Sequence, residues 1–175
     1  DEAANIHQSR ALERAGAHVV YGFLDLKTHA KISIVVRKEG RKLVSYTHFG
    51  TGNYHPITAN FYTDLSFFTK EPDLARDATK VFNYVSGYIE PSEFENISLA
   101  PIDLKKTILQ NLLNEVRLSK QGKPARAWIK LNSLVEKDVI DAMYDASNAG
   151  ERIDLIVRGI CALRPGINGL SENIR

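Results

Sequence analysis

The spacing of hydrophobic residues divides the first half of the chain into helical and extended segments. Apolar positions at helical spacing predict a helix over residues 1–15, and Gly16 is placed to end it. A second helical pattern begins near Pro72, a residue that suits a first helical turn. Between these helices, β-branched and aromatic residues predict strands over residues 19–23, 30–37, 42–48 and 61–69.

The segment 30–37 has the most regular alternation of these strands. Ile32, Ile34 and Val36 share one face, so that face is fully apolar. Val35 gives the other face some apolar character as well. This pattern predicts a central strand that is covered on both sides.

A hairpin tip at residues 39–40 sets the predicted register of strands 30–37 and 42–48. Counting back from this tip places Lys31 opposite His48 and His29 opposite Gly50. Alternate residues of a strand share a face, so His29 and Lys31 point the same way. Two histidines and a lysine are therefore predicted to converge at the open end of one hairpin.

The best candidate for a domain boundary is the stretch 87–101. It breaks the periodicity and contains two prolines. We place the boundary near Asn96, which gives predicted domains over residues 1–96 and 97–175.

The second domain has the pattern of an α/β unit. A long helix precedes a strand, a helix and a strand, which predicts parallel pairing through a right-handed crossover. Ser133 and Glu136 form a predicted capping box for the middle helix, and Gly150 is placed to close it. The predicted long helix spans residues 102–120, and the strands span 126–131 and 152–160.

Composition is that of an ordinary globular protein. The 175 residues are 43% hydrophobic and 25% charged, enough for one large domain or two small ones. The net charge of +2 is too small to indicate nonspecific binding to nucleic acid or to a membrane surface. Cys161 is the only cysteine, which excludes an internal disulfide but is neutral about the compartment; a reducing cytoplasm is the expectation. No apolar run is long enough to span a membrane.

Positive charge is concentrated between Asp25 and His48. This segment has six lysines or arginines against two acidic residues. Beside glycines, such an excess suits a polyanion. The charges of residues 37–42 also fit a solvated hairpin tip, which is the ordinary place for charge.

His29 is the leading candidate for a nucleophile. A neutral imidazole attacks phosphorus without a strong base, and the Lys31 ammonium would offset charge on the phosphoryl oxygens. A lone strand histidine often only packs or hydrogen-bonds, but the lysine and the second histidine argue against that reading. A zinc site on His29 and His48 is an alternative that lacks a third ligand at convincing spacing.

Other residues fit a phosphate or nucleotide site. Gly50, Gly52 and Asn53 belong to a loop whose backbone N–H groups no bulky side chain shields. Arg158 lies toward the C-terminal end of a strand, where open α/β sheets bind ligands, although a surface arginine fits that place equally. Tyr62 suits stacking on a base or binding a phosphate, and it also suits a half-buried place in the sheet.

Several separate motifs resemble those of one known family, the bacterial polyphosphate kinases of the first type. The similarity is to the C-terminal half of these proteins and extends over nearly the whole chain. The motifs are Leu26 with His29-Ala30-Lys31, Thr47-His48-Phe49-Gly50-Thr51-Gly52-Asn53, Tyr62-Thr63-Asp64, Lys130-Leu131-Asn132-Ser133-Leu134-Val135 and Leu155-Ile156-Val157-Arg158-Gly159-Ile160-Cys161.

The resemblance implies an α/β, phospholipase D-like fold, with a mixed sheet flanked by helices in a nearly complete first domain and a truncated, similar second domain. In this family the histidine matching His29 is phosphorylated by ATP and passes its phosphoryl group to polyphosphate. His48 matches a second histidine of the site, and Tyr62 and Arg158 match residues that contact the nucleotide. Val36 stands near where an aspartate would complete the phospholipase D signature, which disfavours a phosphodiesterase.

The resemblance also implies partners, and parts of the site beyond these residues. The substrates are ATP or ADP and inorganic polyphosphate, with Mg²⁺ accompanying the nucleotide. Residues that complete the site lie before Asp1 and after Arg175, so no metal ligand is expected within this chain and the chain alone is expected to be inactive. The full-length enzyme is expected to be a cytoplasmic, bacterial homo-oligomer with peripheral membrane association and no nucleic-acid partner.

Two other interpretations stay open. One is a phospholipase D-like phosphodiesterase or nuclease that uses His29 on a diester. The other, for the isolated chain, is a non-catalytic module that binds polyanions.

Overall fold

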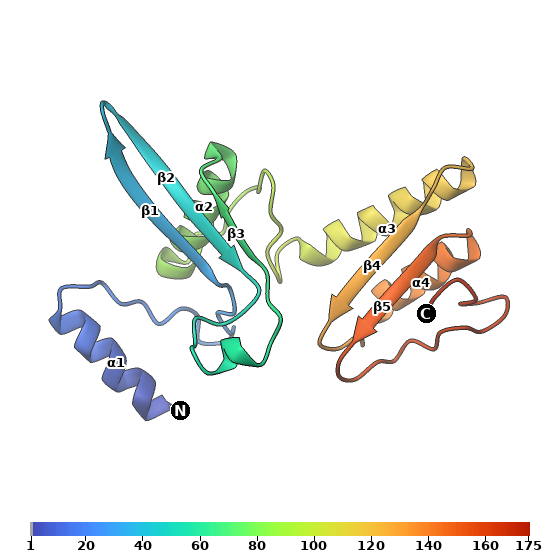
Figure 1. The fold of residues 1–175 in the computed structure, drawn as a ribbon, viewed down its shortest axis with the longest axis horizontal. Coiled ribbons are helices and arrows are strands. Elements are labelled where there is room, and N and C mark those ends of the chain that lie inside the picture. Colours follow the sequence, from blue (N-terminus) through green and yellow to red (C-terminus); the bar gives the residue numbers. More distant parts are fainter. Residues whose placement is uncertain (1) are drawn as a thin grey trace. The chain divides into compact units, whose positions relative to one another are not determined.

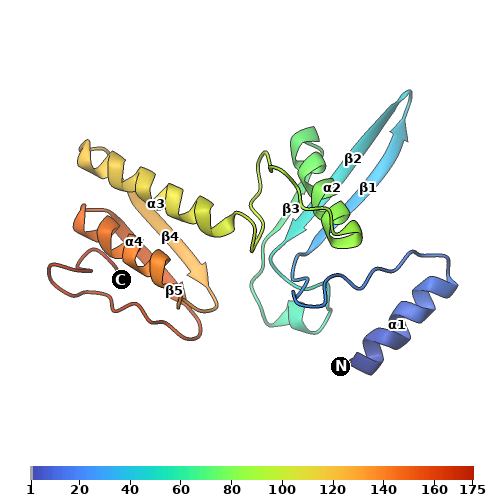
Figure 2. The same ribbon diagram turned by 180° about the vertical axis from the view of Figure 1, so that it is seen from behind.

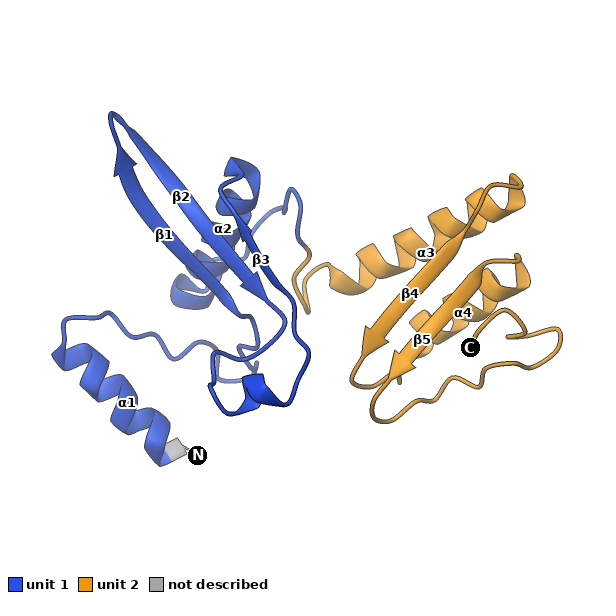
Figure 3. Ribbon diagram, viewed as in Figure 1, with its two compact units in different colours: residues 1–97 blue, residues 98–175 orange. Residues whose placement is uncertain are grey.

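The computed structural model describes residues 2–175, and Figures 1 and 2 show its elements from two sides. Asp1, where the first predicted helix begins, lies outside the described residues. The chain divides into two compact units, Asp1–Ile97 and Ser98–Arg175 (Figure 3). The division follows Ile97, next to Asn96 of the sequence-based boundary. Each unit mixes helices with a small sheet, as the predicted α/β class requires.

The first unit is built on a three-stranded antiparallel sheet in the order β1-β2-β3. The helix α2 packs against β1 and β2 on one face of this sheet (Figure 2). The elements of the unit are α1 (Glu2–Arg14), β1 (Ile32–Glu39), β2 (Lys42–Gly50), a short 3₁₀ helix (Thr58–Asn60), β3 (Ser66–Thr69) and α2 (Pro72–Gly87).

The two faces of β2 have different surroundings. Ser45 lines a groove beside α2, and Thr47, on the same face of the strand, is buried. His48 therefore points to the opposite face. Its direct neighbours across the sheet are Ser33 on β1 and Phe68 on β3. We call this side, defined by Ser33, His48 and Phe68, the His48 face.

The register of the hairpin differs by two residues from the predicted one. Ser33 pairs with His48, in place of the predicted Lys31. The turn consists of Gly40 and Arg41, and Gly40 has a φ of 61°, as the first central residue of a type II′ turn requires. A shift of two residues keeps every side chain on its predicted face, so Lys31 and His48 still share a face.

The prediction of a central strand over residues 30–37 is also wrong. β1 is an edge strand, with Val35 and Val36 56% and 59% exposed, and β2 is the central strand. Apolar alternation reports which positions can be buried, but the order of strands in the sheet depends on β3, which is distant in sequence.

Residues 19–23 form no strand, and residues 61–65 lie outside β3. The aromatic ring of Phe23 instead packs against Tyr84 and Tyr88 near the end of α2, at centroid distances of 4.7 and 5.0 Å. The Tyr88 hydroxyl also donates to the Gly22 carbonyl oxygen at 2.7 Å. The β-forming residues of this segment are therefore used in packing against a helix, without a neighbouring strand.

A buried carboxylate connects α2 to the end of the first unit. Asp77 accepts hydrogen bonds from the backbone N–H groups of Glu95 and Asn96 at 2.9 and 2.7 Å. Burial raises the pKa of Asp77, but these bonds and the nearby Lys80 outweigh burial and bring the pKa below its ordinary value. The charged form of Asp77 thus holds the segment that leads into the second unit.

The second unit has the predicted strand, helix, strand order, with parallel pairing of its two strands. Its core gathers residues of both helices and the strands around Met143 and Ile153, which are 2% and 0% exposed. Gly150 has a φ of 92° and follows the end of the middle helix, as predicted. The elements are α3 (Leu104–Lys120), β4 (Arg126–Leu131), α4 (Lys137–Asn148) and β5 (Arg152–Val157).

The predicted capping box at the start of α4 is wrong. Glu136 itself is the N-cap residue, and no side chain caps this helix. The Glu136 carboxylate instead pairs with Lys105 of α3 at 2.6 Å. The Glu136 side chain thus pairs with α3 in place of forming the predicted capping box.

Candidate functional site

His29 and Lys31 lie together at the start of β1, as the sequence predicts. The His29 side chain is exposed. The Lys31 Nζ lies 3.0 Å from Nδ1 and 3.1 Å from Nε2 of His29, and it donates to the His29 carbonyl oxygen at 2.7 Å. The predicted nucleophile thus has an ammonium group beside its ring.

The surroundings of Lys31 favour an added negative charge. Partial burial and the positive charge of Lys27 lower the pKa of Lys31, while Asp64 opposes this change. A phosphoryl group beside the ammonium would offset both the burial and the repulsion from Lys27. Lys31 is therefore suited to hold an anion next to His29.

His48 is held by groups from three parts of the first unit. Its Nδ1 lies 2.7 Å from the hydroxyl of Tyr54, and its ring centroid lies 4.4 Å from that of Phe68. A Cβ at Gly50 would lie 3.1 Å from Cε1 of His48, so glycine at this position leaves room for the imidazole. Lys31 lies beside Gly50 across the hairpin, since the Gly50 N–H donates to the Lys31 carbonyl oxygen at 2.8 Å.

The loop from Gly50 to Asn53 does not have the arrangement predicted for it, in which unshielded backbone N–H groups would bind an anion. The N–H groups of Gly50 and Thr51 donate within the sheet, to the carbonyl oxygens of Lys31 and Leu65. The Asp64 carboxylate occupies the space over Gly52, where a Cβ would lie 2.1 Å from Oδ2. Thr51 holds this carboxylate by donating from Oγ1 to Oδ1 at 3.0 Å. The N–H groups of Gly50 and Thr51 are thus already bonded.

Asn53 directly follows Gly52, over which the Asp64 carboxylate lies. Its carbonyl oxygen accepts from the N–H of His55 at 2.8 Å, which tightens the chain just before the 3₁₀ helix. Tyr62 comes after that helix, and its side chain is 55% exposed. Tyr62 is therefore partly open to solvent.

Arg158 belongs to the second unit and directly follows β5, at the C-terminal ends of the parallel strands. Its Nε donates to Oδ1 of Asn132 at 2.5 Å, and its N–H donates to the carbonyl oxygen of Leu131. A Cβ at Gly159 would lie 2.7 Å from the Asn132 carbonyl oxygen, so glycine lets the two strand ends approach. The predicted position of Arg158 at this edge of the sheet is confirmed.

Sequence reasoning missed Asp64 and Tyr54 as parts of the site. Asp64 stands in the motif Tyr62-Thr63-Asp64, which was one available signal. Tyr54 had no comparable signal, because its contact with His48 arises only when the loop after β2 folds back over the sheet.

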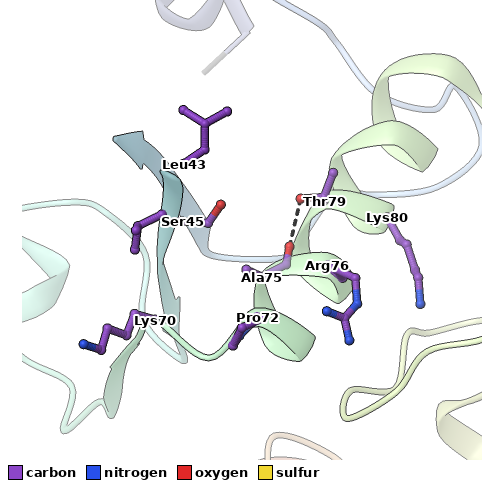
Figure 4. Close-up of a pocket in the computed structure, with 9 residues that line it drawn as sticks. Leu43, Ser45, Lys70, Pro72, Ala75, Arg76, Thr79 and Lys80 are labelled. Carbon is purple, nitrogen blue, oxygen red and sulfur yellow. Dashed lines mark hydrogen bonds between the residues drawn. The ribbon is translucent and has the colours of Figure 1, made fainter. Parts of the chain in front are cut away.

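A groove of about 500 Å³ lies beside α2, on the side of β2 away from His48 (Figure 4). Ser45 points toward α2 there, and Arg76 and Lys80 extend from the helix (Figure 4). Arg76 pairs with Glu95 at 2.7 Å, and Lys80 pairs with Asp77 at 3.2 Å. Arg76 and Lys80 are therefore less available to an anion in this groove, which Lys70 also lines.

Among residues 2–175, no three side chains of histidine, cysteine, aspartate or glutamate lie close enough together to hold a metal ion. A zinc site on His29 and His48 therefore finds no third ligand of these types in the described chain. Within the same range, every helix is too short or too polar to cross a bilayer.

Comparison with known proteins places these features in a family. Residues 1–91 match the family model "Polyphosphate kinase C-terminal domain 1", and residues 97–175 match "Polyphosphate kinase C-terminal domain 2". The polyphosphate kinase of Erythrobacter litoralis is 55% identical and that of Streptomyces coelicolor is 49% identical, each over 100% of this chain and 24% of the relative. The crystal structure of polyphosphate kinase from Porphyromonas gingivalis matches with a TM-score of 0.87 and 34% identity, covering 98% of this chain and 26% of that one.

The fold is thus of the α/β, phospholipase D-like class, which the sequence predicted. The chain belongs to the polyphosphate kinase family, and both of its units lie in the C-terminal part that the family models describe. It spans about a quarter of the length of the curated relatives that it matches.

Proposed function

We propose that this chain carries the phosphorylated histidine of a polyphosphate kinase, which reversibly transfers the γ-phosphate of ATP to polyphosphate through phospho-His29. One observation carries this proposal: the exposed His29 imidazole has the Lys31 ammonium within 3.0 to 3.1 Å of its ring nitrogens. Membership of the polyphosphate kinase family supports the proposal of polyphosphate and a nucleotide as substrates.

The chemistry follows from this pair. A lone pair on a His29 ring nitrogen attacks the γ-phosphorus, an N–P bond forms, and the bond from phosphorus to the ADP oxygen breaks. The Lys31 ammonium shifts from the imidazole to the phosphoryl oxygens, where charge gathers during transfer. A terminal oxygen of polyphosphate then attacks the phosphorus, the N–P bond breaks, and the His29 imidazole is regenerated.

The remaining residues have proposed roles in binding. His48, on the same face of the hairpin as Lys31, contacts the phosphoryl group, and the Gly50 to Asn53 loop shapes the edge of its site. Tyr62 and Arg158 contact the nucleotide. Magnesium is proposed to come with ATP and to shield its phosphates.

The complete activity belongs to a longer protein. The relatives are about four times the length of this chain, and we propose that the chain alone binds polyanions without turnover. Homo-oligomerisation and peripheral membrane association are proposals for the full-length enzyme that rest on family resemblance alone.

Incubation of the full-length enzyme with ATP labelled at the γ-phosphate tests the proposal. We expect a protein-bound label that is lost in acid and stable in base, as a phosphohistidine is, and we expect His29→Ala to abolish it. His18→Ala, a second exposed histidine of the first unit, should keep the label. A label that survives in His29→Ala would contradict the proposal, and activity on diesters with no label from ATP would favour the phosphodiesterase.

A further inference from the structure

Tyr54 connects two side chains of the His48 face. Its hydroxyl oxygen lies 3.0 Å from Oγ of Ser33 and 2.7 Å from Nδ1 of His48. Ser33 and His48 are direct partners across the β1–β2 ladder, so their positions are fixed by the sheet. The loop after β2 brings the phenol to both of them.

These two hydrogen bonds favour one tautomer of His48. The Ser33 hydroxyl donates to the Tyr54 oxygen. The phenol has a single proton, and its 2.7 Å contact with Nδ1 of His48 allows it to donate that proton to the ring. A neutral imidazole that accepts at Nδ1 carries its own proton on Nε2.

The Nε2 atom of His48 has no hydrogen-bond partner among the described residues and lies out of contact with solvent. The tilted ring of Phe68 lies 4.4 Å from the imidazole, and Gly50 leaves just enough room at Cε1, so the imidazole is packed from two sides. A buried N–H without an acceptor is unfavourable, and a bond made to it in such a place is stronger than in water. Nε2 is thus a donor that lacks its acceptor.

We propose that Tyr54 is a positioning residue, which holds His48 in the tautomer protonated at Nε2 so that His48 donates a hydrogen bond to a phosphoryl oxygen once substrate binding uncovers that nitrogen. The identity of the acceptor rests on the proposed function, since Lys31 and His29 lie on the same side of the hairpin. The tautomer rests only on the contacts among Ser33, Tyr54 and His48.

Nitrogen NMR of the histidine rings in this chain tests the tautomer directly. We expect His48, assigned by comparison with His48→Gln, to carry its proton on Nε2, and we expect Tyr54→Phe to give a mixture of both tautomers. Tyr46→Phe is the matched control, because it removes a phenol that bonds Glu39 at 2.9 Å, and it should leave His48 unchanged. A proton on Nδ1 in the unmodified chain, or a Tyr54→Phe spectrum identical to it, would overturn the proposal.

Labelling kinetics in the full-length enzyme test the consequence. Tyr54→Phe should slow phosphorylation of His29 roughly tenfold, the loss expected from one misplaced hydrogen bond. Tyr54→Phe combined with His48→Gln should be no slower than His48→Gln alone, because Tyr54 acts through His48. Additive losses would overturn the positioning role. Because NMR needs no phosphoryl transfer, failure of the proposed function is distinguishable from failure of this inference.

Discussion

At the scale of single residues, two glycines determine which side chains can enter the candidate site. Gly50 leaves room for the imidazole of His48, and Gly52 leaves room for the carboxylate of Asp64. Asp64 is also close enough to Lys31 to influence its pKa. A methyl group at either position would therefore act on the proposed chemistry through a neighbouring side chain.

Gly52→Ala is expected to displace Asp64. The new Cβ would lie 2.1 Å from Oδ2 and 2.4 Å from Cγ, so the carboxylate must rotate and leave the Thr51 hydroxyl. We expect a local cost of about 1–3 kcal/mol, measured as hydrogen exchange of the Leu65 amide that is roughly tenfold faster or more. That amide donates to the same Thr51 hydroxyl.

Gly87→Ala is the control for this substitution. A Cβ at Gly87 meets its nearest neighbours at an ordinary 3.8 Å, so exchange of the Leu65 amide should stay unchanged. Equal effects of the two substitutions would show that the space over Gly52 is not the cause.

At the scale of elements, an unusual buried acid lies directly before β5. Glu151 precedes this strand and is 0% exposed, and neither carboxylate oxygen has a hydrogen-bond partner among the described residues. Burial, and then the negative charge of Glu115 on α3, raise the pKa of Glu151 to about 7. The folded second unit therefore favours the protonated acid.

This raised pKa predicts that stability falls as the pH rises. The folded state keeps a proton that the unfolded chain has lost, so the free energy of unfolding should decrease between about pH 4.5 and pH 7 and then level off. The loss is up to about 3 kcal/mol. Urea unfolding at a series of pH values measures this loss of stability. The signal is the fluorescence of Trp128 on β4, the chain's one tryptophan.

Glu151→Gln should remove this part of the pH dependence and stabilise the chain at pH 8, because a neutral amide replaces a buried charge. Glu172→Gln, an exposed acid of the same unit, should retain the slope. A Glu151→Gln curve parallel to that of the unmodified chain would show that Glu151 does not titrate in this range.

Local patterns predicted those elements whose formation depends on nearby residues. The strand Arg126–Leu131 and the helix starting at Pro72 were predictable from periodicity and from proline at a helix start. The hairpin register was not, because Gly40 can occupy either turn position in the sequence, and the structure uses it as the first. The edge position of β1 depends on β3, which pairs with β2 from farther along the chain.

In the candidate site, too, contacts between residues close in sequence were predictable and contacts between distant residues were not. His29 and Lys31 are two residues apart on an extended segment, so their contact was predictable from strand geometry alone. Tyr54 and Asp64 reach the site through loops that fold back on the sheet, and no periodicity records such a path. Residues that meet through loops need coordinates to be found.

At the scale of the whole molecule, the proposed residues are distributed between the two units. His29, Lys31 and His48 lie in the first unit, while Arg158 lies in the second. Each unit matches its own family model, and the contribution of both units to one activity is a proposal for the longer enzyme. The identity of the nucleophile is the claim on which the other assignments depend.

The most direct measurement of that claim is the position of the phosphate after reaction with ATP. The full-length enzyme is mixed with ATP, kept at alkaline pH throughout digestion, and its peptides are sequenced by mass spectrometry. We predict phosphate on the imidazole of His29 and none on His48. Phosphate on His48 or on any residue other than His29 would contradict the account.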